Sequence, residues 1–147
     1  CEAQLVEAQS TYDRMKRAIE SRLHWLRTCR WPSMTGEYFE KFLVEVFTER
    51  GYAVERTGRS GDQGVDLIVS RGGLRVAVQA KGYTSGNVGN SAGQEAHTGM
   101  SHYRCHKAAV ITNADFTSGA HSLAQSVRCV LINGSQIPDL IEGRLTL

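Results

Sequence analysis

Three polar residues stand at positions where they could carry out hydrolytic chemistry together. Asp66 is followed, after twelve intervening residues, by Gln79 and, two positions later, by Lys81. A carboxylate and an amide oxygen are ligands for a hard divalent cation such as Mg²⁺, and a bound cation can neutralise a phosphate and activate a water. A lysine beside such a site can orient or deprotonate that water. The set suits phosphodiester hydrolysis, although the same spacing also occurs on ordinary polar hairpins.

The segment that carries these residues has the pattern of a β-hairpin. Two alternating segments flank Gly72 and Gly73, which can form a two-residue turn. Counting outward from that turn places Asp66 directly opposite Gln79, with Cβ atoms roughly 4.5 to 5.5 Å apart. Because side chains alternate along a strand, Lys81 shares the face of Gln79. The residues predicted to face the core from the same strand are Val76, Val78 and Ala80.

A helix predicted over residues 36–50 brings a second carboxylate to this region. Its apolar residues recur at helical spacing and indicate one buried face, and Gly51 is typical of a helix C-terminus. These apolar residues are Phe39, Phe42, Leu43, Val46 and Phe47. Glu40 adjoins the apolar stripe, so it is either a partly buried carboxylate or a solvated flank residue.

The second half of the chain is predicted to alternate helices and strands. Ser91 and Gln94 have the spacing of a capping box and predict a helix that runs towards His106. Thr117 or Ser118 is expected to cap a short helix between two buried strands, and such a unit predicts parallel pairing with a right-handed crossover. Strands are predicted at 52–57, 65–70, 74–81, 108–112 and 127–132, with a closing helical turn at 137–141.

The first 31 residues are predicted to be an amphipathic helix or linker that precedes a domain over residues 32–147. From about residue 3 to 27 there is no Gly or Pro, and apolar residues recur every seven positions at Leu5, Tyr12, Ile19 and Leu26. The helix is expected to end at Trp31, Pro32 and Ser33. Arg22 interrupts the alternate heptad positions, so a helix lying on its own domain and a coiled coil joining two copies both remain open.

Composition and charge describe one globular domain with a basic N-terminal end. The 147 residues are 41% hydrophobic and 22% charged, which is ordinary for a folded domain. Residues 1–31 carry six basic groups against four acidic ones, whereas residues 32–147 carry eleven of each. The net charge of +2 is therefore an N-terminal property.

Cysteine usage and hydropathy bear on the compartment. The four cysteines form no C-x-x-C pair, which favours reduced thiols over a zinc ribbon or redox motif. No apolar run approaches the roughly 18 to 20 residues of a membrane span, so a cytoplasmic location is expected. Because the chain opens on Cys1, an upstream segment that targets a membrane or a partner is also expected.

Several short motifs follow one another in a characteristic order between residues 34 and 134. They are Met34 to Glu40, Gly51-Tyr52, Thr57, Ser60 to Ile68, Val78 to Lys81, Val88-Gly89, Gln94-Glu95 and Ile111 to Thr117. In this order they resemble the Mrr-like catalytic domain, a family of the PD-(D/E)xK nucleases. The resemblance covers most of the chain and implies an α/β fold, a restriction-endonuclease-like mixed β-sheet flanked by helices, with the N-terminal helix as an addition.

The resemblance also implies roles for individual residues. Asp66 matches the metal-binding aspartate and Lys81 the catalytic lysine, while Gln79 replaces the acidic residue of the superfamily pattern. Glu40 matches the family's helical glutamate, and either Glu40 or the backbone carbonyl of Ala80 is expected to complete the metal shell. The expected DNA-contact residues are Asp62, Gln63 and Gln94. The implied cofactor is Mg²⁺, for which Mn²⁺ can substitute.

The implied function is a metal-dependent endonuclease that hydrolyses double-stranded DNA in restriction or in defence against foreign DNA. The alternative is a catalytically inactive module that binds DNA or a protein on the same fold. The presence of both Asp66 and Lys81 favours the enzyme. A second copy, joined through the N-terminal helix, is a further expected partner.

Overall fold

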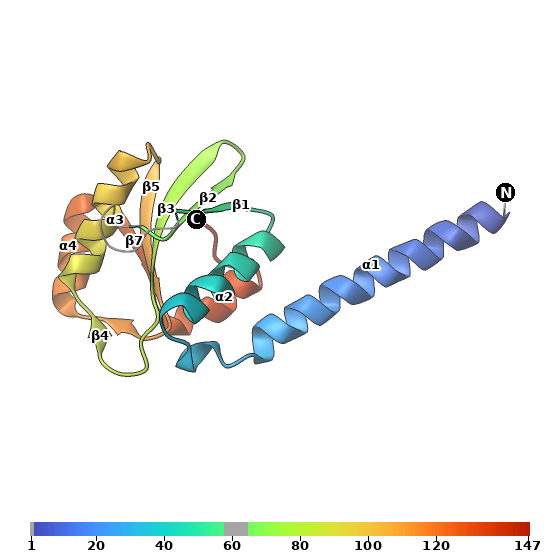
Figure 1. Ribbon diagram of the computed structural model, residues 1–147, viewed down its shortest axis with the longest axis horizontal. Helices are drawn as coiled ribbons and strands as arrows, with labels where there is room; N and C mark the ends of the chain where they lie inside the picture. Colours follow the sequence, from blue (N-terminus) through green and yellow to red (C-terminus); the bar gives the residue numbers. More distant parts are fainter. Residues whose placement is uncertain (1, 58–64) are drawn as a thin grey trace.

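A five-stranded mixed sheet forms the centre of the computed structural model, which describes residues 2–57 and 65–147 (Figure 1). In sheet order its strands are β1 (Ala53–Arg56), β2 (Leu67–Arg71), β3 (Leu74–Lys81), β5 (Lys107–Thr112) and β7 (Cys129–Ile132). β1, β2 and β3 pair antiparallel, whereas β3, β5 and β7 pair in parallel. The predicted α/β fold with a mixed sheet flanked by helices is therefore confirmed.

The hairpin of β2 and β3 has the predicted register. Gly72 and Gly73 have φ angles of +60° and +83°, the left-handed conformation that two-residue hairpin turns require. Leu67 pairs with Val78 at the open end of the ladder. Asp66 follows at the next position, where its backbone N–H donates to the Val78 carbonyl at 3.0 Å.

Two crossover helices cover one face of the parallel half of the sheet. α3 (Asn90–His102) connects β3 to β5, and α4 (Ser118–Val127) connects β5 to β7. The two helices pack against each other on that face (Figure 1). A short parallel pair, β4 (Asn87–Val88) and β6 (Asp115–Phe116), forms a second small sheet that the sequence pattern did not predict.

The caps of these two helices differ in how well the sequence predicted them. Thr117 caps α4 by accepting a backbone hydrogen bond at 3.1 Å, which confirms one of the two expected caps. The prediction of a capping box at Ser91 and Gln94 is wrong, because α3 begins at Asn90 and its N-cap is Gly89. A glycine cap has no side chain to accept a hydrogen bond from the first turn.

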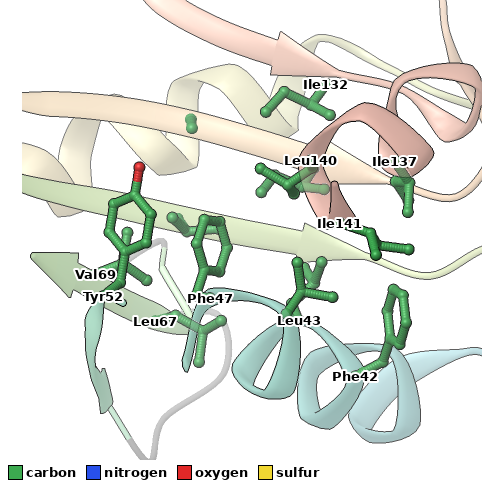
Figure 2. Packing of buried hydrophobic residues seen from close by; sticks show 14 of the residues in the cluster. Phe42, Leu43, Phe47, Tyr52, Leu67, Val69, Ile132, Ile137, Leu140 and Ile141 are labelled. Atoms are coloured by element: carbon green, nitrogen blue, oxygen red, sulfur yellow. The ribbon is translucent and has the colours of Figure 1, made fainter. Parts of the chain in front are cut away.

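Large side chains fill the face of the sheet beneath α2 (Gly36–Glu49). The five predicted apolar residues of α2 are buried, and they pack against β2, β3 and the C-terminal helix α5 (Ile137–Ile141), as Figure 2 shows. Val76 and Val78 belong to the same cluster, and Ala80 packs against it, as predicted. Burying each such aliphatic or aromatic side chain contributes about 1.5 to 3 kcal/mol, so this cluster dominates the stability of the domain.

Small side chains fill the opposite face, beneath α3 and α4. The buried residues of α3 are Ala92, Gly93, Ala96 and Gly99. They meet a cluster that includes Ala108 and Val110 of β5. Because these side chains are short, the backbone of α3 lies close to the sheet, and a polar side chain on this helix can reach the strands.

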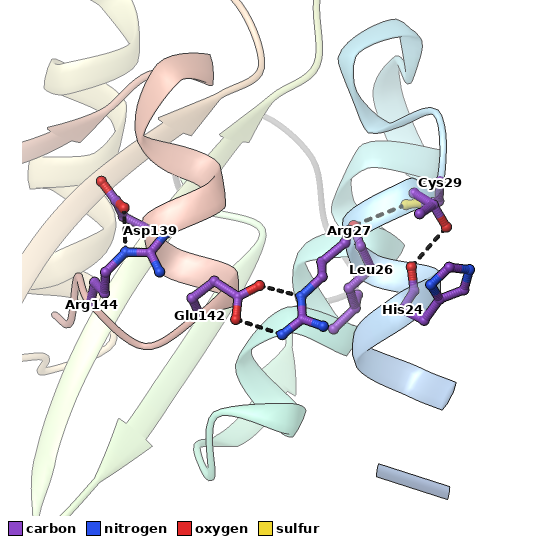
Figure 3. A network of polar contacts seen from close by, with 8 residues as sticks. His24, Leu26, Arg27, Cys29, Asp139, Glu142 and Arg144 are labelled. Carbon is purple, nitrogen blue, oxygen red and sulfur yellow. Dashed lines mark hydrogen bonds and ion pairs between the residues drawn. The ribbon is translucent and has the colours of Figure 1, made fainter. Parts of the chain in front are cut away.

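α1 (Glu2–Thr28) projects from the domain as a long single helix (Figure 1). Leu26 is its one buried residue, and it joins the cluster beneath α2. Next to it the Arg27 guanidinium donates two hydrogen bonds to Glu142 at the end of α5, one of them 2.8 Å long (Figure 3). The last turns of α1 therefore pack on the domain, and the domain boundary at residue 31 stays a prediction.

Hydropathy and cysteine state were the other properties predicted from the sequence. Within the described residues, no helix is long and apolar enough to cross a membrane. The described cysteines are free thiols, as predicted, namely Cys29, Cys105 and Cys129. The predicted thiol of Cys1 and the predicted DNA-contact residues Asp62 and Gln63 lie outside the described ranges.

Candidate active site

Asp66 lies at the open end of the β2–β3 hairpin and is fastened to both neighbouring strands. Its carboxylate Oδ2 accepts a hydrogen bond from the backbone N–H of Ala80 at 2.8 Å. Its own carbonyl accepts from the N–H of Thr57 at 3.1 Å. With its backbone and one carboxylate oxygen held in this way, the Asp66 side chain has a fixed position beside β3.

The surroundings of Asp66 raise the pKa of its carboxyl group above the ordinary value. Burial is the main cause, because it removes the charged form from water. The carboxylates of Glu40 and Glu95 raise the pKa further, while the N–H of Ala80 and the ammonium group of Lys81 lower it. Asp66 is therefore a carboxylate whose negative charge a bound cation would stabilise.

Gln79 lies on β3 with its side chain almost completely buried, at 5% exposure. Its Nε2 group donates to Glu95 Oε2 of α3 at 2.9 Å. Its other terminal atom, Oε1, is buried and has no hydrogen-bond partner. A buried acceptor without a partner costs free energy, and a cation ligated by this oxygen would remove that cost.

Lys81 completes the predicted trio. It lies two residues after Gln79 on the same face of β3, and its Nζ is 3.2 Å from the same carboxylate oxygen of Glu95. The side chain keeps 23% exposure, so the ammonium group is accessible from solvent. The structure thus brings together Asp66, Gln79 and Lys81, as the hairpin register predicts.

Glu40 reaches this region from α2 but is held by another residue. Its Oε1 accepts from Arg56 Nε at 3.0 Å and lies 2.9 Å from Arg56 Nη2. Glu40 is near enough to affect the pKa of Asp66, yet its carboxylate is shared with a guanidinium group. Its role as a supporting metal ligand stays a prediction.

The loop after β3 is packed tightly against the segment that leads into α2. A Cβ atom on Gly82 would lie 2.8 Å from the carbonyl oxygen of Met34, so a glycine is required directly after Lys81. Asn113 donates to the same Met34 carbonyl at 2.8 Å and accepts from the N–H of Tyr83 at 2.9 Å. These contacts fix the Lys81 end of β3 relative to α2.

The donor set fits a hard cation that needs few protein ligands. Asp66 offers a desolvated carboxylate, Gln79 a buried oxygen without a partner, and Mg²⁺ is commonly held by one or two carboxylates with waters. Within the described residues, no three His, Cys, Asp or Glu side chains gather as a metal cluster. A carboxylate oxygen and an amide oxygen are the donor types that suit Mg²⁺ or Mn²⁺.

The role of Gln94 on α3 as a DNA-contact residue stays a prediction, whereas the sequence pattern did not single out its neighbour Glu95, whose side chain reaches the site. Gln94 is exposed, whereas Glu95 contacts both Gln79 and Lys81. The signal was present: Glu95 lies three residues after the buried Ala92, within the stripe of small residues that faces the sheet. A partly buried carboxylate beside such a stripe is within reach of polar groups on the sheet.

The fold and this site together define a nuclease domain of the restriction-endonuclease class. The family model that matches the chain is described as restriction endonuclease (Mrr_cat) and covers residues 32–141. The match spans most of the chain, so the protein belongs to the Mrr family of restriction endonuclease catalytic domains.

One relative agrees with this assignment, and one solved structure shares the fold alone. The type IV methyl-directed restriction enzyme EcoKMrr of Escherichia coli (strain K12) is 31% identical over an alignment of 112 residues, and the match covers 70% of this chain and 36% of the relative. The chain thus spans about a third of that relative's length. A structural neighbour of unknown function, AF1548, has a TM-score of 0.61 at 18% identity, covering 74% of this chain and 67% of its own.

A second solved structure is the MspJI restriction endonuclease in complex with a 27-mer oligonucleotide. Its TM-score is 0.43 at 19% identity, covering 84% of this chain and 30% of the MspJI chain.

Proposed function

We propose that this domain is a Mg²⁺-dependent endonuclease that hydrolyses phosphodiester bonds of double-stranded DNA in restriction or defence. The observation that carries the proposal is the placement of Asp66, directly before β2, beside the unpartnered Oε1 of Gln79 on the adjoining β3, with Lys81 on the same face of β3. The membership of a restriction endonuclease family supports it.

Each residue then has a task that follows from its position. Asp66 and Gln79 Oε1 would hold Mg²⁺, with the backbone carbonyl of Ala80 or the carboxylate of Glu40 as a further ligand. A bound Mg²⁺ would supply charge neutralisation at the scissile phosphate and a water of lowered pKa. Lys81 orients the attacking water and offsets negative charge that builds up on the phosphate. The water oxygen bonds to phosphorus while one P–O ester bond breaks.

A plasmid-nicking assay tests the proposal. Supercoiled plasmid should be nicked or linearised with Mg²⁺ or Mn²⁺ and should stay intact with a chelator. Asp66→Ala should remove this activity while DNA binding, measured by anisotropy, persists. DNA binding without metal-dependent cleavage in the unaltered protein would instead identify an inactive binding module.

We also propose that a second copy of the chain covers the projecting part of α1. The apolar residues that continue the line of the buried Leu26 are exposed, with Leu5 at 71%, Tyr12 at 60% and Ile19 at 41%. A solvent-exposed helix gains little stability from propensity alone, and a heptad stripe is typical of helix pairing. The proposed dimer would place two nuclease sites on one assembly.

Sedimentation velocity of the purified chain tests this partner. Ile19→Asp should shift a dimer to a monomer, because it places a charge within the stripe. Val6→Asp is the matched control, since Val6 is exposed on the same helix but off the stripe. Equal behaviour of both variants would contradict pairing through this face.

A further inference from the structure

The carboxylate of Glu95 stands between two members of the site. One oxygen, Oε2, lies 2.9 Å from Gln79 Nε2 and 3.2 Å from Lys81 Nζ. Glu95 belongs to α3, whereas Gln79 and Lys81 belong to β3. Both contacts are made across the interface of small residues, where the helix backbone lies close to the sheet.

The contact with Gln79 decides which end of its amide faces the site. A glutamine presents an acceptor oxygen on one side and a donor NH₂ group on the other, and a rotation of the amide by half a turn exchanges them. An ionised carboxylate only accepts hydrogen bonds, so Glu95 selects the NH₂ group. The Oε1 atom is consequently left pointing away from Glu95, buried and without a partner.

The contact with Lys81 strengthens that selection. The Lys81 ammonium group lies 3.2 Å from the same carboxylate oxygen, so the acceptor of the Gln79 hydrogen bond is part of an ion pair. A hydrogen bond to a charged acceptor is about twice as strong as one between neutral groups. The amide of Gln79 is thus held in one orientation by a charge-assisted bond.

We infer that Glu95 is the positioning residue that turns Gln79 into an oxygen ligand, in place of the carboxylate used elsewhere in the superfamily. Without Glu95, the Gln79 amide could present its NH₂ group to the cation, which would repel it. This inference rests on the proposed function for the identity of the ligand, but the orientation of the amide can be measured without any cleavage.

A double-mutant cycle separates positioning from simple charge attraction. Mn²⁺ affinity is measured from the electron-spin resonance signal of free Mn²⁺, for Glu95→Ala in the native chain and in a Gln79→Met background. If Glu95 acts through the amide, Glu95→Ala weakens binding by about 10- to 100-fold in the native background. It should change affinity by less than about twofold when residue 79 has no amide.

Two results of the cycle would overturn the inference. An equal loss in both backgrounds would mean that Glu95 acts only as a nearby negative charge, and no loss in either would mean that it does not act on the ion. Glu45→Ala is the matched control, because it removes an exposed carboxylate from α2. Glu95→Gln is a milder second variant, whose amide can donate as well as accept and should therefore give an intermediate loss.

An NMR measurement on the metal-free protein tests the orientation directly. The side-chain amide signal of Gln79, assigned by its loss in Gln79→Met, should show one downfield proton that exchanges slowly with water. Glu95→Ala should abolish this feature and Glu45→Ala should keep it, whereas an unchanged signal in Glu95→Ala would refute the inference. If the native chain binds no divalent ion, the proposed function fails, and this NMR result alone decides on Glu95.

Discussion

The two faces of the sheet are packed in different ways and serve different ends. Beneath α2 the buried residues are large, including Phe39, Phe42 and Phe47. Beneath α3 and α4 most of the buried residues are small, including Ala92, Ala96 and Ala108. The large residues supply most of the apolar burial, and the small ones supply a close approach of helix to strand.

This difference explains why the polar candidate site lies on the face beneath α3, where the buried side chains are small. Gln79 alternates with the core-facing Val78 and Ala80 on β3, so it points to the α3 face. A bulky layer there would separate Glu95 from Gln79 and Lys81. The large apolar core and the polar candidate site therefore lie on opposite faces of one sheet.

The largest expected effect is on cleavage by the site itself. Lys81→Ala and Asp66→Ala should each lower metal-dependent DNA cleavage by at least about 1,000-fold, within the range for loss of a group that acts on the reacting water. Both residues lie at the site and outside the large cluster beneath α2. The circular dichroism spectrum should therefore stay native, and near-normal nicking by either variant would contradict the assignment.

The next effect concerns the face beneath α2. Phe47→Ala should lower the free energy of unfolding by about 3 to 5 kcal/mol, because the substitution leaves a cavity beside Tyr52. The rings of Phe47 and Tyr52 meet edge to face, with their centroids 5.3 Å apart. Urea denaturation measures this loss. Cleavage per folded molecule should remain close to native at low temperature, and a specific loss of activity would show that the two faces are coupled.

A smaller loss of stability with a larger loss of activity is expected on the other face. Ala96 is fully buried on α3, so Ala96→Leu should cost about 1 to 3 kcal/mol by overpacking. Since the helix must move away from β3 to accept the larger side chain, the contacts of Glu95 with Gln79 and Lys81 should lengthen. Mn²⁺ affinity, measured below the melting temperature, should fall, and unchanged affinity would show that the close approach is not required.

The smallest effect is a dependence of stability on pH through Asp66. Its pKa is raised in the folded state, mainly by burial, so ionisation destabilises the metal-free protein as pH rises above the ordinary value of 3.8 through the folded pKa. Asp66→Asn should therefore raise the melting temperature slightly at pH 7, and the gain should vanish below that window. Thermal unfolding at several pH values measures it, and saturating Mg²⁺ should reverse the order at pH 7.

The relative positions of the three hairpin residues follow from local sequence alone. Strand alternation has a period of two, and the Gly72-Gly73 turn leaves one register, so Asp66, Gln79 and Lys81 could be placed on one face without knowing the rest of the fold. The apolar stripe of α2 was equally readable, because a helix with five large apolar residues on one side has to bury them.

Tertiary structure alone decided which distant groups complete the site. The contact of Glu95 with Gln79 depends on the rotation of α3 against the sheet, and the contact of Glu40 with Arg56 depends on where α2 meets β1. The seven-residue repeat of α1 is a further example. The repeat predicts a helix, but of its four apolar residues only Leu26 is buried against the rest of the chain. Local spacing sets which side chains share a face, whereas contacts between elements far apart in the chain depend on how those elements pack.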